Sequence, residues 1–388
     1  MTRLLRKLRN ESGMSYVFVG LSFMAFISAS ILAIDVGMLM TARNQAQNSA
    51  DAGALAGAVA LAFDDYDDRS ATGPAVTSAI AGAMANQVMA GDVSVKPTDV
   101  EFLNNEDGLN NRVKVTVYRT SAPGRDNPLP LLMARYLRLR ETADIGATAT
   151  AEASPANAQD CVLPFTIPDR WNEVHTPAFD PSDDFEAFKF PQGTPLANPD
   201  EYIGPEDKDN YTGYNPHRDR GMQIALKADQ GSKLAPSMYQ VWDVEGANRG
   251  SDDVRDAVCG CKQQVLGYGQ TFVHKPGFQA GPVEQGIECL INKDPGAYWD
   301  DVNKRVVTTM AKSPRIRAIP LFDPWYYDQG NPHGRVARLK FVNYLGFFIE
   351  GMKGNEVVGR IVPIGGLTMG SLPDGPPAAF PYSILLVK

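Results

Sequence analysis

The feature that most constrains this chain is an uncharged segment of 23 residues, from Ser12 to Ile34. About 20 predominantly apolar residues are enough to cross the hydrocarbon core of a bilayer as a helix. A cleaved signal peptide is the alternative, but its apolar region is normally shorter and ends at a site of small residues. Here the segment continues without Pro or a turn cluster into helix-forming sequence. This continuity favours an uncleaved transmembrane helix over residues 13–40.

Basic residues stand on one side of this helix. Four lie in the preceding tip, residues 1–12: Arg3, Arg6, Lys7 and Arg9. In the twenty residues after the span the basic residue is Arg43. The positive-inside rule therefore predicts a cytoplasmic tip, with everything beyond about Met40 on the other side of the membrane.

Small residues recur every fourth position in the span, at Ala25, Ala29, Ala33 and Gly37. That spacing places them along one helix face, where another helix can approach closely. The alternative is that alanine is simply common in membrane helices. Asp35 stands at the outer end of the span, where a carboxylate can reach water. The stripe is thus a candidate helix-packing interface, which could also support an oligomer.

The next residues, 41–62, are rich in Ala and Gly. Gly53 and Gly57 are four apart, beside a second four-residue row: Ala42, Ala46, Ala50, Ala54 and Ala58. A helix face of such small side chains buries too little alone to hold a helix in water, so it needs a partner. We expect one helix from about Met14 to Phe63. A second helix, Ala75 to Ala90, would pair with its outer half as a hairpin.

The order of short motifs carries a family resemblance. Arg-Asn-Glu-Ser-Gly ends at Gly13, Ala-Ile-Asp-Val-Gly ends at Gly37, Arg43 precedes Gln47 by four residues, and an Ala/Gly-rich run occupies residues 50–58. This arrangement resembles the TadG-like proteins of the Flp, or tight adherence (Tad), pilus-assembly system. The resemblance implies a non-enzymatic protein of the inner membrane with its bulk in the periplasm or outside. Its partners would be pilus subunits or other pilus-assembly proteins.

Two family features are absent from the sequence. Related pseudopilins are cleaved after a Gly with Glu five positions beyond, whereas Gly13 is followed at that offset by Phe18. Longer relatives carry a von Willebrand-type domain with an Asp-x-Ser-x-Ser metal motif. The nearest string here, from Asp180 to Asp184, lacks the second Ser. We therefore expect an uncleaved anchor and no metal-dependent adhesion site.

The rest of the chain predicts an α+β fold. Residues 41–154 form a small ectodomain with the helical hairpin, a short helix at 128–139 and strands at 93–95, 100–103, 112–120 and 145–153. Residues 155–388 form a β-rich ectodomain with long loops, where helical periodicity nearly disappears. Its expected strands are 302–310, 316–321, 337–350, 356–363 and 383–387. The stretch 168–221 has so many loop formers that it is either an extended surface loop or partly disordered.

Four cysteines lie in the second ectodomain: Cys161, Cys259, Cys261 and Cys289. Outside the cytoplasm an even count favours disulfides. A bond from Cys259 to Cys261 would close a very tight ring, so we expect each of them to pair with one of the other two. A zinc site is the alternative, although Cys-x-Cys without a second close pair is a poor match.

Motifs for catalysis or cofactor binding are missing. The net charge of −8 argues against nucleic acid, and the four histidines are isolated in sequence. No P-loop, nucleophile elbow or dinucleotide-binding motif occurs. We therefore expect no catalytic, cofactor or metal site. The aromatic run with Trp325, Tyr326 and Tyr327 could bind a partner, but such a run more often packs its rings into the core.

Three functions are compatible with these sequence features. The preferred one is a non-enzymatic component of Flp-type pilus assembly, acting through helix packing and ectodomain contacts. The second is a membrane-tethered adhesin or ligand-binding protein that uses the β-rich domain and Trp325. The third, a hydrolase with scattered catalytic residues, has no support beyond the presence of His and acidic residues.

Overall fold

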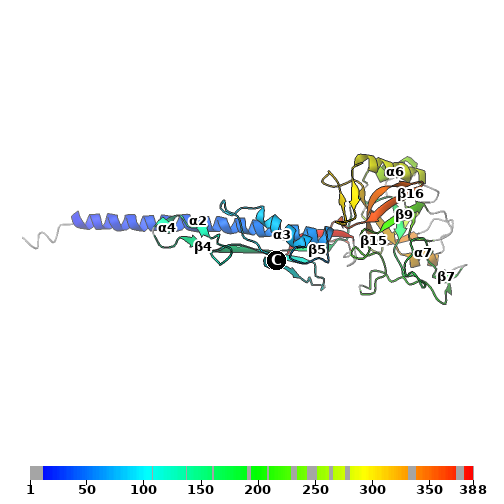
Figure 1. Cartoon of the computed structure of the whole chain (residues 1–388), viewed down its shortest axis with the longest axis horizontal. Helices are drawn as coiled ribbons and strands as arrows, with labels where there is room; N and C mark the ends of the chain where they lie inside the picture. Colours follow the sequence, from blue (N-terminus) through cyan, green and yellow to red (C-terminus); the bar gives the residue numbers. More distant parts are fainter. Residues whose placement is uncertain are drawn as a thin grey trace, which may run out of the picture. The chain divides into compact units, whose positions relative to one another are not determined.

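The structure is a computed structural model. It describes residues 12–106, 108–136, 138–159, 161–189, 194–207, 209–228, 234–242, 251–261, 265–275, 280–330, 338–372 and 380–387. The basic tip lies outside these residues, apart from Ser12. The chain divides into two compact units (Figure 1), the first built from residues 1–58, 68–152 and 386–388 and the second from 59–67 and 153–385. Helices and strands in the first part and a β-rich second part confirm the predicted α+β class.

One helix, α2, runs without interruption over Ser12–Phe63, as the sequence predicts. Among the described residues it is the helix long and apolar enough to cross a membrane. The hydroxyls of Ser28 and Ser30 donate to carbonyls one turn earlier, at 2.8 and 2.9 Å. Because these hydroxyls are satisfied within the helix, the serines are compatible with an apolar environment.

The first unit packs α2 against a second helix and an antiparallel sheet. Its elements are α3 (Pro74–Met84), η1 (Pro97–Asp99), β1 (Val100–Leu103), β2 (Arg112–Arg119), β3 (Leu129–Pro130), α4 (Met133–Tyr136), β4 (Thr142–Ala143) and β5 (Ile145–Pro155). Strand β2 pairs with β1 and β5, while β3 pairs with β4. Alternate residues of β2 are buried, as its sequence pattern predicts.

Two predictions for the first unit are wrong in detail. Helix α3 ends at Met84 instead of residue 90, and Met89 and Ala90 have positive φ values of 49° and 56°, which a helix does not allow. The backbones of Val88 and Gly91 bond to each other there and form a tight turn. The expected strand 93–95 is reduced to an isolated bridge from Ser94 to Tyr118.

The second unit contains a closed barrel. Its strands are β6 (Phe165–Pro168), β9 (Gln223–Ala228), β10 (Met238–Val241), β14 (Ile316–Phe322), β15 (Arg338–Lys353) and β16 (Glu356–Ile361). They pair in the order β15-β14-β6-β10-β9-β16, and β16 pairs back with β15. Strand β15 pairs with both β14 and β16. It is 16 residues long, and the two strands pair mainly with different parts of it. Buried aromatic and aliphatic side chains fill the interior.

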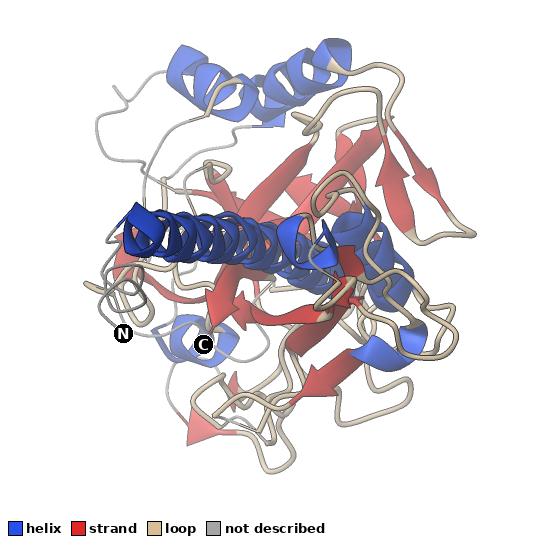
Figure 2. Ribbon diagram, turned by 90° about the vertical axis from the view of Figure 1, so that its left-hand side faces the viewer, coloured by secondary structure: helices blue, strands red, loops and turns tan. Residues whose placement is uncertain are grey.

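The remaining elements lie outside the closed strand order of the barrel. They are β7 (Phe188–Lys189), β8 (Thr194–Pro195), α5 (Ser251–Cys259), β11 (Thr271–Val273), α6 (Ala280–Lys293), β12 (Tyr298–Asp300), β13 (Arg305–Val307), α7 (Pro324–Gly330), β17 (Ile364–Gly365) and β18 (Pro381–Val387). Helices α5 and α6 pack together, and α6 also contacts β15. This helix pair lies at the top of Figure 2, above the red strands of the second unit. The prediction that this part of the chain nearly lacks helices is therefore wrong.

The stretch 168–221, expected to be a surface loop or disordered, is packed where the structure describes it. Asp169 is fully buried and accepts hydrogen bonds from the hydroxyls of Tyr202 and Tyr211 and from the backbone N–H of Tyr214. Burial raises the pKa of Asp169 to about 6, although these donors favour its ionised form. Trp171 and Tyr214 are also fully buried.

Candidate functional site: the long helix and its surroundings

The N-terminal half of α2 presents an exposed apolar surface. The side chains of Ala25, Ala29 and Ala33 are exposed, as is Gly37. A methyl group added at Gly37 would meet no atom within 4 Å. This part of the described structure therefore leaves the small-residue stripe open to a lipid or to another helix.

The C-terminal half of α2 is covered by the first unit itself. The alanine row predicted from the sequence is buried, each residue at most 1% exposed: Ala42, Ala46, Ala50, Ala54 and Ala58. Ser49 donates its hydroxyl to the carbonyl of Ala83 at 2.8 Å, and Gln45 accepts from the N–H of Met89 at 2.7 Å. Helix α3 thus forms the antiparallel partner of α2 that the sequence analysis expects.

Gly53 and Gly57 are points of close approach in this packing. A Cβ at Gly53 would lie 2.9 Å from both the carbonyl oxygen of Ala79 and the Cβ of Ala83. A Cβ at Gly57 would lie 2.8 Å from a methyl of Val113 on β2. Neighbours at these distances must move to accommodate even one methyl group. The two glycines therefore face the chain's own helix and sheet, in contrast to the exposed stripe.

Asp35 joins the end of the apolar segment to a loop of the first unit. Its carboxylate, 7% exposed, accepts hydrogen bonds from the backbone N–H groups of Leu132, Met133 and Ala134, at 3.2, 3.1 and 2.7 Å. Met133 and Ala134 belong to α4, which lies beside α2 in Figure 1. The sequence placed Asp35 at the outer end of the span but did not identify this contact.

The loop held by Asp35, residues 132–136 and 138–140, carries both apolar and basic side chains on its surface. Leu132, Tyr136 and Leu139 are 59%, 82% and 75% exposed. Three arginines of the same loop are also exposed: Arg135, Arg138 and Arg140. Large apolar side chains grouped on a surface indicate contact with a partner or a membrane.

The aromatic run at α7 is mostly packed inward. Trp325 lies 4.7 Å from the ring of Phe188, and Tyr327 lies 5.3 Å from that of Phe322, both distances between ring centroids. The hydroxyl of Tyr327 accepts from Gln240 at 2.7 Å. Tyr326 is 38% exposed. The run thus offers mainly Tyr326 to a partner.

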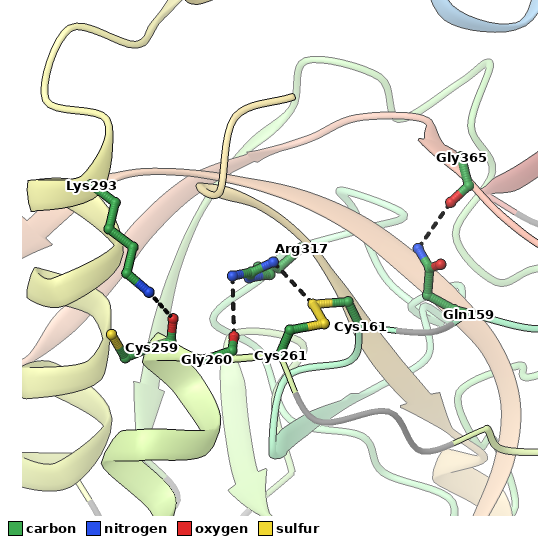
Figure 3. The surroundings of a disulfide bond; sticks show 8 residues. All are labelled: Gln159, Cys161, Cys259, Gly260, Cys261, Lys293, Arg317 and Gly365. Atoms are coloured by element: carbon green, nitrogen blue, oxygen red, sulfur yellow. Dashed lines mark hydrogen bonds between the residues drawn. A yellow bond between two sulfur atoms is a disulfide. The ribbon is translucent and has the colours of Figure 1, made fainter. Parts of the chain in front are cut away.

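The four cysteines form two disulfides, Cys161–Cys261 and Cys259–Cys289, so the predicted presence of disulfide bonds is confirmed. Their Cα–Cα separations of 5.1 and 5.5 Å are normal for disulfides. The second bond links α5 to α6. Figure 3 shows the guanidinium of Arg317 between Cys161 and the carbonyl of Gly260, at 3.0 and 3.1 Å. The cysteine cluster is therefore tied to β14 as well as to the helix pair.

Among the described residues, one group has the composition of a metal site. Ligand atoms of Glu173, His175 and Asp200 lie within 4.8 Å of one another. Burial, together with the nearby acidic groups of Asp200 and Asp183, raises the pKa of Glu173 to about 7. This group was not predicted from the sequence, because Glu173 and His175 are two residues apart and do not have the helical spacing of a metal-ligand pair.

Comparison with known proteins gives one match. Residues 13–60 match the family model described as Flp pilus-assembly TadE/G-like. No curated protein and no solved structure matches the chain. The matched residues lie within α2 and include its exposed stripe and both packed glycines.

Proposed function

We propose, from the match of residues 13–60 to the TadE/G-like family, that this protein is a non-enzymatic, inner-membrane-anchored component of Flp-type pilus assembly. Residues 13–40 cross the membrane once, with residues 1–12 in the cytoplasm and the rest in the periplasm. The partners are other pilus-assembly proteins or pilus subunits.

The observation that carries this proposal is the different environment of the two halves of α2. The half rich in buried alanine already has its partner within the chain, whereas the stripe from Ala25 to Gly37 is exposed. Close helix packing in a membrane depends on small residues that let backbones approach. The stripe is therefore the surface through which α2 contacts a helix of the assembly or of a second copy.

A deletion of the gene tests the assembly role. We expect the deletion strain to lose surface pili, measured after shearing, and the intact gene on a plasmid to restore them. A Gly37→Leu gene should restore fewer pili than the intact gene while the protein stays at its normal level. That result is expected because the new side chain fills the stripe, at a position where an added Cβ would meet no atom within 4 Å.

Other outcomes of this experiment favour the alternative. Unchanged pili in the deletion strain would contradict the assembly role. The membrane-tethered adhesin would then be the better proposal, with Tyr326 as the exposed aromatic to replace first. Full complementation by Gly37→Leu would leave the assembly role standing and refute the interface at the stripe.

A further inference from the structure

The group formed by Glu173, His175 and Asp200 lies in the second unit. Glu173 and Asp200 are 7% and 3% exposed, whereas His175 is exposed. The three residues come from two segments whose backbones bond to each other, because Asn172 and Glu201 exchange N–H···O bonds of 3.0 Å. Two buried carboxylates are thus held beside one accessible imidazole.

Each donor is oriented by a neighbour. The indole N–H of Trp171 donates to one oxygen of Glu173 at 2.7 Å. The N–H groups of Val174 and Glu186 each donate to one oxygen of Asp200, at 3.1 and 2.7 Å. Such hydrogen bonds fix the direction of ligand oxygens, as outer partners do in metal sites.

One polar atom in the group is left without a partner. The second oxygen of Glu173, Oε2, is buried and accepts no hydrogen bond in the structure. A buried carboxylate oxygen without a donor is costly, and a second buried carboxylate beside it adds repulsion. A divalent cation would supply the missing partner and neutralise both acids.

His175 has a further carboxylate neighbour. Its Nε2 lies 2.9 Å from a carboxylate oxygen of Asp183. An N–H from Nε2 to Asp183 leaves the lone pair of Nδ1 available for a metal, the tautomer found in carboxylate–histidine–metal arrangements. One imidazole and two carboxylates suit Zn²⁺ or Mn²⁺ better than Mg²⁺. We propose that Glu173, His175 and Asp200 bind one divalent transition-metal cation.

Zinc titration of the full chain tests this site. The protein, purified in detergent with a tag that contains no histidine, is stripped with a chelator and titrated with Zn²⁺ in a calorimeter. We expect one equivalent to bind, and at least about tenfold weaker binding for His175→Ala and for Glu173→Gln. His217→Ala, which also replaces an exposed histidine of this unit, should bind as the parent does.

If Glu173→Gln fails to fold, His175→Ala still tests the site, because an exposed side chain can be replaced without disturbing the core. Absence of binding in the parent, or equal affinity in His175→Ala and His217→Ala, would overturn the proposal.

A second inference concerns the loop held by Asp35 and rests on the proposed membrane anchor. The backbone at residues 132–134 is level with Asp35, the first charged residue after the apolar segment. The loop therefore stands where the helix leaves the hydrocarbon core. Tyrosine and leucine beside arginine suit this depth, because apolar groups enter the interface while guanidinium groups pair with phosphates.

We infer that this loop rests on the membrane surface and binds anionic lipid headgroups. Leu132, Tyr136 and Leu139 enter the interface, and the three neighbouring arginines contact the phosphates. The bilayer is favoured over a protein partner because the loop continues an existing membrane contact and carries the complementary charge.

Spin labels on the full chain in vesicles test this placement. Labels are attached at Tyr136→Cys and, for comparison, at Glu106→Cys, an exposed position in the β1–β2 connection at the other end of the strands. We expect the label at 136 to collide more with oxygen than with a polar nickel reagent, and the label at 106 to do the reverse. The contrast should be larger in vesicles with phosphatidylglycerol than in phosphatidylcholine alone.

A third label separates this inference from the anchor itself. With Ala29→Cys in lipid and residue 136 in water, only the surface contact would be refuted. With both labels in water, the anchor would be refuted as well. Replacing Arg135, Arg138 and Arg140 with Gln should remove the effect of phosphatidylglycerol, and an unchanged effect would exclude the arginines as its cause.

Discussion

Gly53→Leu is expected to destabilise the first unit by about 3 kcal/mol, the upper end of the usual cost of overpacking. The new side chain would meet a backbone carbonyl of α3 at 2.9 Å and a methyl of Val115 at 3.2 Å. The carbonyl oxygen belongs to a helix and cannot rotate away, so α3 must separate from α2. We expect a lower unfolding temperature for this unit and faster proteolysis between α3 and β2.

Gly37→Leu is the matched control, because it places the same side chain on the same helix. Nothing lies within 4 Å of a Cβ at Gly37, so the first unit should unfold as in the parent. Equal unfolding temperatures for the parent and Gly53→Leu would refute the close packing seen between α2 and α3. This experiment also separates the two small-residue faces, one required for the fold and the other proposed for a partner.

Removing the Cys161–Cys261 disulfide is expected to lower the stability of the second unit more than removing the Cys259–Cys289 disulfide. The bonds join residues 100 and 30 positions apart. In the chain-entropy model a loop of about 100 residues corresponds to about 4.7 kcal/mol, and shorter loops to less. The cause is the extra freedom that the unfolded chain gains when the longer loop opens.

Paired replacements by Ala measure this difference without leaving a free thiol. In denaturant unfolding, the Cys161→Ala/Cys261→Ala protein should have a lower midpoint than the Cys259→Ala/Cys289→Ala protein. A protein that lacks all four cysteines should not respond to reductant, which controls for other effects of the reagent. The reverse order of midpoints would show that helix packing at α5 and α6, rather than loop length, sets the contribution of each disulfide.

The sequence was most informative where one local pattern decides the structure. The unbroken run to Phe63 predicted α2, and strict alternation predicted β2 over residues 112–119. A strand was also expected over residues 337–350, where β15 covers Arg338–Lys353. In each case the pattern of residues within the element itself indicates its secondary structure.

Helices α5 and α6 were missed although their sequences contain helical spacing. Val283, Ile287 and Leu290 lie on the buried face of α6, four and three residues apart. The local sequence instead indicates a loop, because it contains Gly281, Pro282 and Gly286. Gly286 is instead a contact point, since a Cβ there would lie 2.5 Å from the Cβ of Val258 on α5. Only the tertiary packing distinguishes such a glycine from a loop residue.

The contacts of the polar residues in the candidate sites were even harder to predict from the sequence. Asp35 is bonded to backbone atoms almost one hundred residues away. Glu173 meets Asp200 through pairing between Asn172 and Glu201, two residues with no periodic signal. Such contacts depend on the register of neighbouring segments, which a single sequence does not specify when loops of unusual length separate them.

The closure of the barrel has a consequence for the order in which the chain folds. Strand β6 begins at Phe165, yet its neighbour β14 begins at Ile316, and β9 pairs with β16 near residue 358. Because a chain is synthesised from its N-terminus, this barrel cannot close until about residue 361 has been made. Contacts so distant in sequence form slowly. The hairpin of α2 and α3, in contrast, needs only the first 84 residues and can form long before the barrel does.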